Sequence, residues 1–513
     1  MLNLRSVYRH AEEHTTLYIG GLFLFLAFLI LLQTIFSPTI VLALIFLSAT
    51  IFLTIVRPLW IVGFLALYLP FESLILKFTP QDAYVLIRYA SELLIYVIAL
   101  VILLRVLVRS VKIPQTPIDL PFILFASTLV GSAIINLVEP SIAILGMRQI
   151  VRFMLVFFLV IYLKPSKKFI QTLTLILFGI VLFECGLGFL QSIVGERLDT
   201  FLLPSDARFV GDITLTSGVT AFWDPGSRIF ATLGRYDRLG NFLYIFLLIA
   251  TGFLFVKQEK RIQRWIPWMF AFGILALMMT FSRASWFAFL LGFLFIGLWV
   301  KRDRRVAIAL VSFVIVVFGY VALTGLAVRS ITEAPGQTFI ERFYESFSAA
   351  RWRGEYYGLG RIYWDVQTPL TVIPLSPIFG VGPGQFGGGA AAALRNTKVY
   401  DRLGLPFGVY GVEGHIDNNW FSIWGEAGTL GFVLFIWMFL VLFRYAMDVY
   451  HGSKDPFTRA IALGFAACVI AISFNGFTST VFEIRTIAFY FWLYGGFVVV
   501  LGESSRNSRS PRL

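Results

Sequence analysis

Long apolar runs, repeated along the whole chain, constrain this sequence more than any other feature. A membrane-spanning helix needs about 20 mostly apolar residues. Candidate runs lie at 17–36, 38–56, 59–71, 84–105, 119–137, 141–163, 169–194, 238–257, 265–281, 283–300, 306–327, 428–446, 459–475 and 484–501. The run at 59–71 is short and could be re-entrant. We therefore expect an all-α polytopic membrane protein with about 14 transmembrane helices, within a range of about 12–14.

The composition excludes a water-soluble protein. Apolar residues make up 58% of the 513 residues and charged residues only 14%, whereas a soluble domain is nearer half apolar and a quarter charged. The runs do not alternate in polarity, as the spans of a membrane β-barrel would. An α-helical membrane fold remains.

Basic residues gather in the short loops between the runs and define the orientation. The clusters are Arg105/Arg109/Lys112, Lys164/Lys167/Lys168, Lys257/Lys260/Arg261/Arg264, Lys301/Arg302/Arg304/Arg305 and Arg506/Arg509/Arg512, with Arg5 and Arg9 in the N-terminal tail. The predicted spans place all of them on one face, which is the cytoplasmic face. Both termini are therefore expected in the cytoplasm. The net charge of +13 is mostly a topology signal, and nucleic-acid binding is not expected because the basic residues are scattered.

Two long segments then fall on the opposite face. The chain divides into an N-terminal transmembrane bundle (1–194), a smaller outer segment (195–237), central transmembrane helices (238–327), a large outer loop domain (328–427), C-terminal transmembrane helices (428–501) and a disordered cytoplasmic tail (502–513). We expect short helices at 338–350 and 358–369 in the large loop. Loops longer than about 15 residues are usually functional, so any chemistry is expected in these two segments.

His415 falls on this outer face, just before a predicted span, while the other three histidines are expected on the cytoplasmic side. An imidazole can act as a general base, or hydrogen-bond a reacting hydroxyl, near neutral pH. The alternative is a histidine that only satisfies a loop backbone. One outer histidine, with Cys185 and Cys468 inside apolar spans, does not make a zinc site. We expect no metal and no other cofactor.

Two arginines stand out near the outer face. Arg283 lies between two apolar spans, where it must snorkel to the interface, pair with an acid or face a polar cavity. Arg361 lies on a predicted helix of the large loop. It can form a surface salt bridge with Asp365, at (i, i+4) spacing, or bind phosphate oxygens with its planar guanidinium group.

A second pair of arginines lies inside an apolar run. Arg148 and Arg152 share one helix face, so they repel each other unless an anion bridges them. A lipid phosphate is one candidate for that anion. The alternative is an acid within the membrane, such as Glu92 or Glu184.

The glycine-rich stretch 379–389 suggests a phosphate cradle at first sight. It lacks the Lys-Ser/Thr of a P-loop and is expected outside the cell, away from ATP. We interpret it as a tight turn that lets backbones pack closely.

The order of these motifs resembles the O-antigen ligase and O-antigen polymerase superfamily of bacterial membrane glycosyltransferases. The matching motifs are Ser282-Arg283 at a span junction, Gly360-Arg361 with Trp364, Gly380 to Phe386 in the glycine-rich turn, and His415 to Asn419 followed by Glu426 to Gly431. Each motif is short, but their order, spacing and topology together are fairly specific. The resemblance covers roughly residues 220–500.

The resemblance implies an inverting, metal-independent glycosyltransferase that faces the periplasm from the bacterial inner membrane. The donor would be a glycan linked to undecaprenyl pyrophosphate. The acceptor hydroxyl would belong to lipid A-core in a ligase, or to another lipid-linked glycan in a polymerase. The sequence does not separate ligase from polymerase. The implied partners are this donor, one of these acceptors and the membrane lipids.

The resemblance also assigns roles to individual residues. Arg283 and Arg361 would hold the donor pyrophosphate, and His415 would position or deprotonate the acceptor hydroxyl. The predicted pyrophosphate set also includes Arg228, Arg235, Arg148 and Arg152, and the predicted support of the acceptor and the loop comes from Asn418, Asn419 and Glu426. Two features depart from the family. The smaller outer segment reads Gly234 to Arg238 where many members carry an Asn-Pro step, and the extra N-terminal spans have no assigned role.

Two other classes of function compete with the glycosyltransferase. A polytopic anion or polysaccharide transporter would also have many spans and intramembrane arginines. Transporters tend to show internal repeats and binding sites at the bilayer midplane, whereas this sequence shows no such repeat and its polar groups gather at the outer edge. A scaffold without catalysis would leave His415 unexplained.

Overall fold

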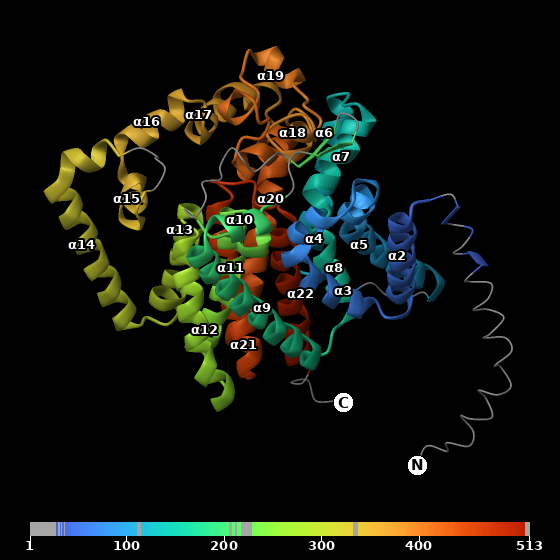
Figure 1. The fold of residues 1–513 in the computed structure, drawn as a ribbon, viewed down its shortest axis with the longest axis horizontal. Helices are drawn as coiled ribbons and strands as arrows, with labels where there is room; N and C mark the ends of the chain where they lie inside the picture. The colour runs from blue at the N-terminus through green and yellow to red at the C-terminus, as the bar shows by residue number, and fades with distance from the viewer. Residues whose placement is uncertain are drawn as a thin grey trace.

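The computed structural model describes residues 27–28, 31, 33–34, 36–109, 114–204, 208–210, 213–216, 228–331 and 337–507. These residues form a bundle of helices with a cap of short helices over one end (Figure 1). The predicted run at 17–36 lies mostly outside the described residues, as does the end of the predicted tail, from 508 onward.

The described part of the chain contains eleven helices long and apolar enough to cross a bilayer. They are α2 (Pro38–Val56), α3 (Pro58–Tyr68) continued by η1 (Leu69–Phe71) and α4 (Glu72–Phe78), α5 (Gln81–Arg109), α9 (Lys167–Val194), α11 (Tyr236–Phe255), α12 (Lys260–Met279), α13 (Arg283–Leu294) with the π-helical η4 (Phe295–Val300), α14 (Arg304–Arg329), α20 (Asn419–Gly452), α21 (Pro456–Asn475) and α22 (Arg485–Asn507). The predicted all-α polytopic membrane fold is confirmed.

The number of membrane spans also depends on three further helices. α7 (Pro140–Val151) and α8 (Met154–Leu163) are bent by 56° at a short break, and they raise the number of spans to twelve if the pair crosses as one. α6 (Asp119–Ile135) is apolar but shorter. The short predicted run at 59–71 extends through η1 and α4, so that α3 to α4 is long enough to cross.

The bundle is centred on α11, α21 and α22, whose apolar windows are mostly buried inside the protein. Small residues let these helices approach closely. A Cβ added to Gly252 of α11 would lie 2.1 Å from the carbonyl oxygen of Ala460 on α21, and one added to Gly464 would lie 2.6 Å from the Cα of Ile249. α2 is the opposite case: few of its apolar side chains are buried, as in a helix that faces lipid.

Short elements connect the spans on the capped side. Between α9 and α11 lie α10 (Glu196–Leu202), the antiparallel strands β1 (Arg208–Val210) and β2 (Ile213–Thr216), and η3 (Ala231–Leu233). Between α14 and α20 lie α15 (Phe339–Tyr344), η5 (Glu345–Phe347), α16 (Ala349–Tyr357), α17 (Arg361–Gln367), η6 (Thr368–Val372), η7 (Ile373–Leu375), α18 (Gly389–Ala393), α19 (Lys398–Leu403) and η8 (Val409–Gly411). The structure thus contains the short helices expected at 338–350 and 358–369, and adds a hairpin that was not predicted.

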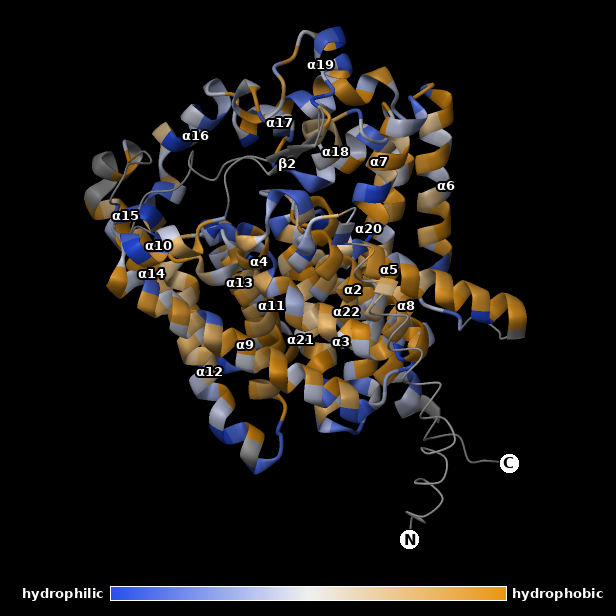
Figure 2. Cartoon of the chain, turned by 45° about the vertical axis from the view of Figure 1, so that its right-hand side comes forward, coloured by the Kyte–Doolittle hydropathy of each residue, from blue (hydrophilic) through white to orange (hydrophobic). Residues whose placement is uncertain are grey.

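Hydropathy follows this arrangement. Figure 2 shows the long helices as a mostly hydrophobic band, with hydrophilic residues concentrated in the α16 to α19 region and at the far end of the bundle, beyond α12. Lys257 lies in the loop before α12, and Lys260 is the first residue of α12.

α20 begins earlier than the predicted span at 428–446. The side chain of Asn418 caps its first turn by accepting a hydrogen bond from the backbone N–H of Phe421 at 3.0 Å, and this explains the start at Asn419. Gly428 then interrupts the helix with a φ of 68°. The predicted boundary therefore marks this break, and the residues before it form a separate helical segment that lies under the cap.

The glycine-rich turn, predicted as a tight turn that allows close backbone packing, packs against this break. The N–H of Val381 donates to the carbonyl oxygen of Gly425 at 2.8 Å. Gly380 has a φ of 70°, and a Cβ on it would lie 2.4 Å from the backbone nitrogen of Gly428. Only glycine permits so close a backbone approach at a positive φ.

Candidate functional site

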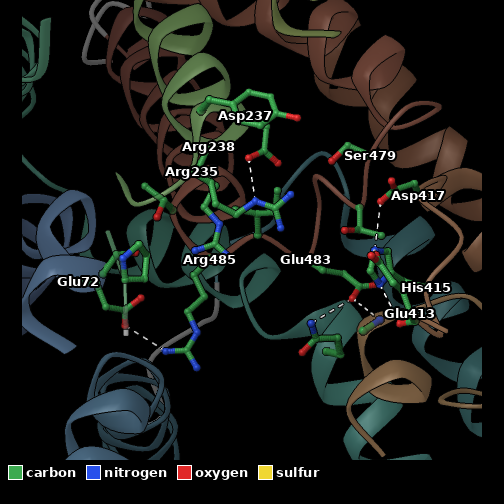
Figure 3. A pocket seen from close by; sticks show the side chains of 18 of the residues that line it. Glu72, Arg235, Asp237, Arg238, Glu413, His415, Asp417, Ser479, Glu483 and Arg485 are labelled. Carbon is green, nitrogen blue, oxygen red and sulfur yellow. Dashed lines mark hydrogen bonds and ion pairs between the residues drawn. The ribbon is translucent and has the colours of Figure 1, made fainter. Parts of the chain in front are cut away.

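A charged cavity of about 360 Å³ lies between the bundle and the cap. Its charged and titratable lining residues are Glu72, Tyr84, Arg88, Arg152, Arg235, Tyr236, Asp237, Arg238, Arg361, Tyr410, Glu413, His415, Asp417, Glu483 and Arg485. They come from α4, α5, the bent pair, the start of α11, α17, η8, the loop before α20, the loop between α21 and α22, and the start of α22. Figure 3 shows Arg235, Arg238 and Arg485 facing His415, Glu413 and Asp417 across the pocket.

His415 lies at the cap side of this cavity, between two carboxylates. Its Nε2 is 3.1 Å from Glu413 Oε2 and 3.4 Å from Asp417 Oδ1. Its Nδ1 is 3.1 Å from the carbonyl oxygen of Glu413. The backbone of His415 is held in place because the N–H of Ile416 donates to the carbonyl oxygen of Gly387, in the glycine-rich turn, at 3.1 Å.

These neighbours favour the protonated imidazole. Burial opposes the charge, but the hydrogen bond that His415 donates to Glu413 and the negative charges of Asp417 and Glu413 outweigh it and raise the pKa of His415 above its ordinary value. Burial raises the pKa of Asp417, but the positive charges of Arg361 and His415 outweigh burial and hold this pKa below its ordinary value. His415 is therefore a stronger base than a free histidine.

Arg361 is brought into the same site through Asp417. Its Nε and Nη2 donate to Asp417 Oδ2 at 3.2 and 3.1 Å. The predicted alternative, a salt bridge with Asp365, is not what forms: Asp365 Oδ1 instead accepts a hydrogen bond from Asn418 at 2.7 Å. Arg361 and His415 are thus the two predicted catalytic residues that share the cavity.

The opposite wall is rich in arginine. Arg485 lies 3.0 Å from both Glu72 and Glu92, and Arg235 lies 3.1 Å from Asp237. Arg88 and Arg238 also line the cavity. Across the described part of the chain, neither of these two forms an ion pair or donates a side-chain hydrogen bond within the protein. They are available to bind an anion in the cavity.

The predicted pair Arg148 and Arg152 is bridged by a protein carboxylate. Arg152 Nη1 lies 2.6 Å from Glu92 Oε1, and Arg148 pairs with the other oxygen of the same carboxylate. Of the two alternatives for the bridging anion, the structure provides the acid Glu92. Arg152 still lines the cavity, whereas Arg148 is not among the lining residues.

Arg283 lies in a different cluster. Its Nη1 is 2.9 Å from Glu345 Oε1, which also lies 3.4 Å from Arg351, while Glu345 Oε2 pairs with Arg342 at 2.9 Å. Glu345 is fully buried and Arg283 is only 15% exposed. This cluster fastens α13 to the first helices of the cap, and the structure does not bring Arg283 to the wall of the charged cavity.

Arg228, another predicted pyrophosphate ligand, is also not among the cavity-lining residues. Its guanidinium carbon lies 4.4 Å from the centre of the Tyr236 ring, a cation–π contact. Tyr236 itself lines the cavity, so Arg228 lies behind one of the lining side chains.

Glu483 is a lining residue that the sequence analysis missed. Its Oε2 accepts hydrogen bonds from Gln149 at 3.0 Å and from the backbone N–H of Gly389 at 2.7 Å. Burial raises its pKa, although those two hydrogen bonds and the charges of Arg152 and His415 lower it. Glu483 joins the bent α7–α8 pair to the start of α18.

The three predicted supporting residues hold the loops that form the site. Asn418 caps α20 and reaches Asp365. Asn419 accepts a hydrogen bond from the N–H of Phe482 at 2.8 Å, and so anchors the loop that carries Glu483. Glu426 Oε1 accepts hydrogen bonds from the N–H groups of Gly384 and Phe386 at 3.0 and 3.2 Å, and so holds the glycine-rich turn.

Sequence reasoning also left Arg88, Arg238, Glu413 and Arg485 out of the predicted site. A signal was present for each, because each is a charged residue close to the outer end of a predicted span or in the outer loop before one. Many charged residues at the membrane interface have this position without a role in a site. The sequence therefore does not distinguish these four residues, and the packing of the helices does. Among the described residues, no group of three or more His, Cys, Asp or Glu side chains is arranged to hold a metal ion.

Part of the chain matches a known protein family. Residues 268–436, about a third of the chain, match the family described as O-antigen ligase. The matched region contains Arg283, Arg361, His415 and Glu426, whereas Arg88, Arg238 and Glu483 lie outside it. No curated protein matches the chain.

The matched family implies O-antigen ligase-type activity, which is a glycosyltransferase-like function in polysaccharide synthesis with lipid-linked glycans as substrates in general. The chain is therefore a multi-pass membrane protein of which residues 268–436 match the O-antigen ligase family.

Proposed function

We propose that the protein transfers a glycan from a polyprenyl-pyrophosphate donor, of the undecaprenyl type, to an acceptor hydroxyl at the periplasmic face of the bacterial inner membrane. The acceptor is either lipid A-core, as in a ligase, or the end of another lipid-linked glycan, as in a polymerase. The transfer inverts the anomeric centre and uses no metal ion. Both termini lie in the cytoplasm, and the capped end of the bundle faces the periplasm.

One observation carries this proposal. A single cavity holds a histidine made more basic by two carboxylates and, facing it, a wall of arginines that includes Arg88 and Arg238, which have no acidic partner among the described residues. A pyrophosphate group is the anion that arginine forks suit. An acceptor hydroxyl needs a base, and His415 is that base. Both requirements of the transfer reaction thus meet in one place.

The reaction divides between the two walls of the cavity. The acceptor oxygen attacks the anomeric carbon of the donor sugar from the side opposite to the pyrophosphate. As this bond forms, the bond from the same carbon to the pyrophosphate oxygen breaks, and its electron pair leaves with the pyrophosphate. Fixed arginines stabilise the negative charge that develops there.

The hydroxyl proton passes to the neutral form of His415. The resulting imidazolium is stabilised by Glu413 and Asp417, because both carboxylates lie within 3.4 Å of Nε2. Arg361 binds Asp417 with two hydrogen bonds and so keeps this carboxylate directed at the histidine. Arg283 has a supporting role in this proposal, because it fixes the cap to α13 through Glu345.

The proposal is tested by glycan transfer with purified protein. A lipid-pyrophosphate-linked repeat unit is incubated with and without lipid A-core, and the products are separated by mass. We expect His415→Ala and Arg361→Ala each to lower the rate by at least about 100-fold, the lower part of the range for loss of a general base. His451→Ala is the matched control, because His451 is exposed in the last turn of α20, where its ring hydrogen-bonds the carbonyl oxygen of Met447.

The outcome of this assay is unambiguous. Transfer at the wild-type rate by both His415→Ala and Arg361→Ala would contradict the assigned chemistry. Product that appears only when lipid A-core is present indicates a ligase, and product that lengthens without it indicates a polymerase.

A further inference from the structure

A second cavity, of about 470 Å³, lies on the N-terminal side of the bundle among α2, α3, α4 and α5. Its lining residues are Thr39, Leu42, Ala43, Phe46, Leu47, Thr50, Phe64, Leu65, Tyr68, Ile75, Pro80, Ala83, Leu86, Ile87, Ala90, Ser91 and Leu94. None of them is charged. A cavity of this size falls within the roughly 300–1,000 Å³ of small-molecule sites, and an apolar lining excludes water.

The cavity opens toward the lipid side of the bundle. Leu42 and Phe46 of α2 line it and are nevertheless 66% and 61% exposed. Ile75 of α4, another lining residue, is 39% exposed. A cavity whose wall is partly exposed on an outward-facing apolar helix is accessible to a chain that arrives from within the bilayer.

Two helices that line the apolar cavity, α4 and α5, also form a wall of the charged cavity. On α4, Glu72 faces the charged cavity and Ile75 the apolar one. On α5, Arg88 faces the charged cavity, while its neighbour Ile87 faces the apolar one. Ser91 Oγ, on the apolar side, donates to Glu72 Oε1 at 3.1 Å, which shows how thin the wall is. One molecule with an anionic head and an apolar tail can therefore occupy both cavities.

We propose that the apolar cavity binds the isoprenoid chain of the polyprenyl-pyrophosphate donor, close to its pyrophosphate end; this inference rests on the proposed function. The charge of the neighbouring cavity selects the head group, because Arg88 and Arg238 have no acidic partner in the described part of the chain and a pyrophosphate carries more negative charge than a phosphodiester lipid. Small residues, Ala43 and Ala90, leave the space that the chain fills. The N-terminal spans, which lie outside the O-antigen ligase domain, thereby acquire a role in donor binding.

The first test measures binding without any glycan transfer. Ala43→Phe places a ring in the apolar cavity, and Ala49→Phe places the same ring on an exposed position of α2 that does not line it. The probes are undecaprenyl pyrophosphate without a glycan and inorganic pyrophosphate, titrated into the full-length protein in detergent. We expect Ala43→Phe to weaken undecaprenyl pyrophosphate binding by about tenfold, a shift in Kd that is readily resolved, while inorganic pyrophosphate binding stays unchanged. Ala49→Phe should bind both probes like the wild type.

Equal binding of undecaprenyl pyrophosphate to Ala43→Phe and to the wild type would overturn the inference. A second measurement uses only the wild-type protein, so that it does not depend on whether a variant folds. Undecaprenyl pyrophosphate with a photoreactive group on an isoprene unit near the pyrophosphate should label residues 39–50 and 83–94. Labelling elsewhere in the bundle, or displacement of the label by an equal concentration of phosphatidylglycerol, would contradict the assignment to a polyprenyl chain.

The binding test and the transfer assay fail independently. If no glycan is transferred but Ala43→Phe still discriminates between the two probes, the proposed function is wrong and the lipid site stands. If transfer is observed but the photolabel lies elsewhere, the proposed function stands and the chain binds along another surface.

Discussion

Arg238 and Arg485 line the same cavity but differ in their partners. Substitutions at the two positions can therefore distinguish a loss of anion binding from a loss of protein stability. Arg485 lies 3.0 Å from Glu72 and from Glu92 and is 13% exposed. Arg238 forms no ion pair among the described residues. Glutamine at either position removes the positive charge and keeps a polar side chain of smaller size. We therefore expect Arg238→Gln to lose mainly anion binding, and Arg485→Gln to lose stability as well.

The magnitudes follow from the contacts. A hydrogen bond to a charged group contributes about 1.5–3 kcal/mol, so Arg238→Gln should weaken inorganic pyrophosphate binding by about 10–150-fold. Its free energy of unfolding should fall by less than about 1 kcal/mol, because no carboxylate loses a partner. Removal of one partner from a buried ion pair costs roughly 3–5 kcal/mol. The loss of stability in Arg485→Gln should lie near the lower end of this range, because Glu92 keeps its ion pairs with Arg148 and Arg152.

The assay combines two measurements on each purified variant in detergent. Calorimetric titration with inorganic pyrophosphate gives the Kd, and thermal unfolding gives the change in stability. Arg305→Gln is the control, because Arg305 is exposed at the start of α14, far from the cavity lining. The reasoning is refuted if Arg238→Gln binds pyrophosphate like the wild type, or if it loses as much stability as Arg485→Gln.

Two further predictions concern the base and the turn. Glu413→Gln removes a carboxylate that raises the pKa of His415. Because the neutral imidazole is the active form, the loss of transfer as pH falls should begin at a lower pH in this variant than in the wild type. A pH–rate profile that does not move would exclude His415 as the base. Gly428→Ala, at the break in α20, places a Cβ 2.2 Å from the carbonyl oxygen of Ile378 at a φ of 68°, so it should lower stability by at least about 2 kcal/mol. Gly319→Ala, whose Cβ meets nothing within 4 Å, should not lower it. Equal thermal unfolding of the two variants would argue against close backbone packing at this break.

The fold class was readable from the sequence because each membrane-spanning helix is a local property. A run of apolar residues of sufficient length must form a helix to satisfy its backbone in lipid, whatever surrounds it. The α20 boundary shows the limit of this reasoning. Its first segment, from Asn419 to Gly428, is too polar to be recognised as part of a span, and it is helical because Asn418 caps it and the glycine-rich turn packs against it.

The candidate site was only partly readable. His415 and Arg361 were found because the loop containing them is long, polar and similar to a known family. The remaining cavity residues come from helices far apart in the sequence, such as α5, α11 and α22. Arg283 illustrates the converse, since a conspicuous arginine at a span junction is paired with buried Glu345 instead of lining the cavity.

The sequence by itself thus determined that the chain is a helical membrane protein, which end carries the long polar loops, and which loop holds the histidine. Tertiary structure alone decided which arginines have acidic partners. That property depends on distances of 3–4 Å between side chains hundreds of residues apart, such as Arg485 with Glu72. Hydropathy and motif spacing contain no such distances, because helix packing sets them. The positive charge of Arg88 and Arg238, which have no acidic partner among the described residues and on which donor binding is proposed to depend, is therefore a product of the fold.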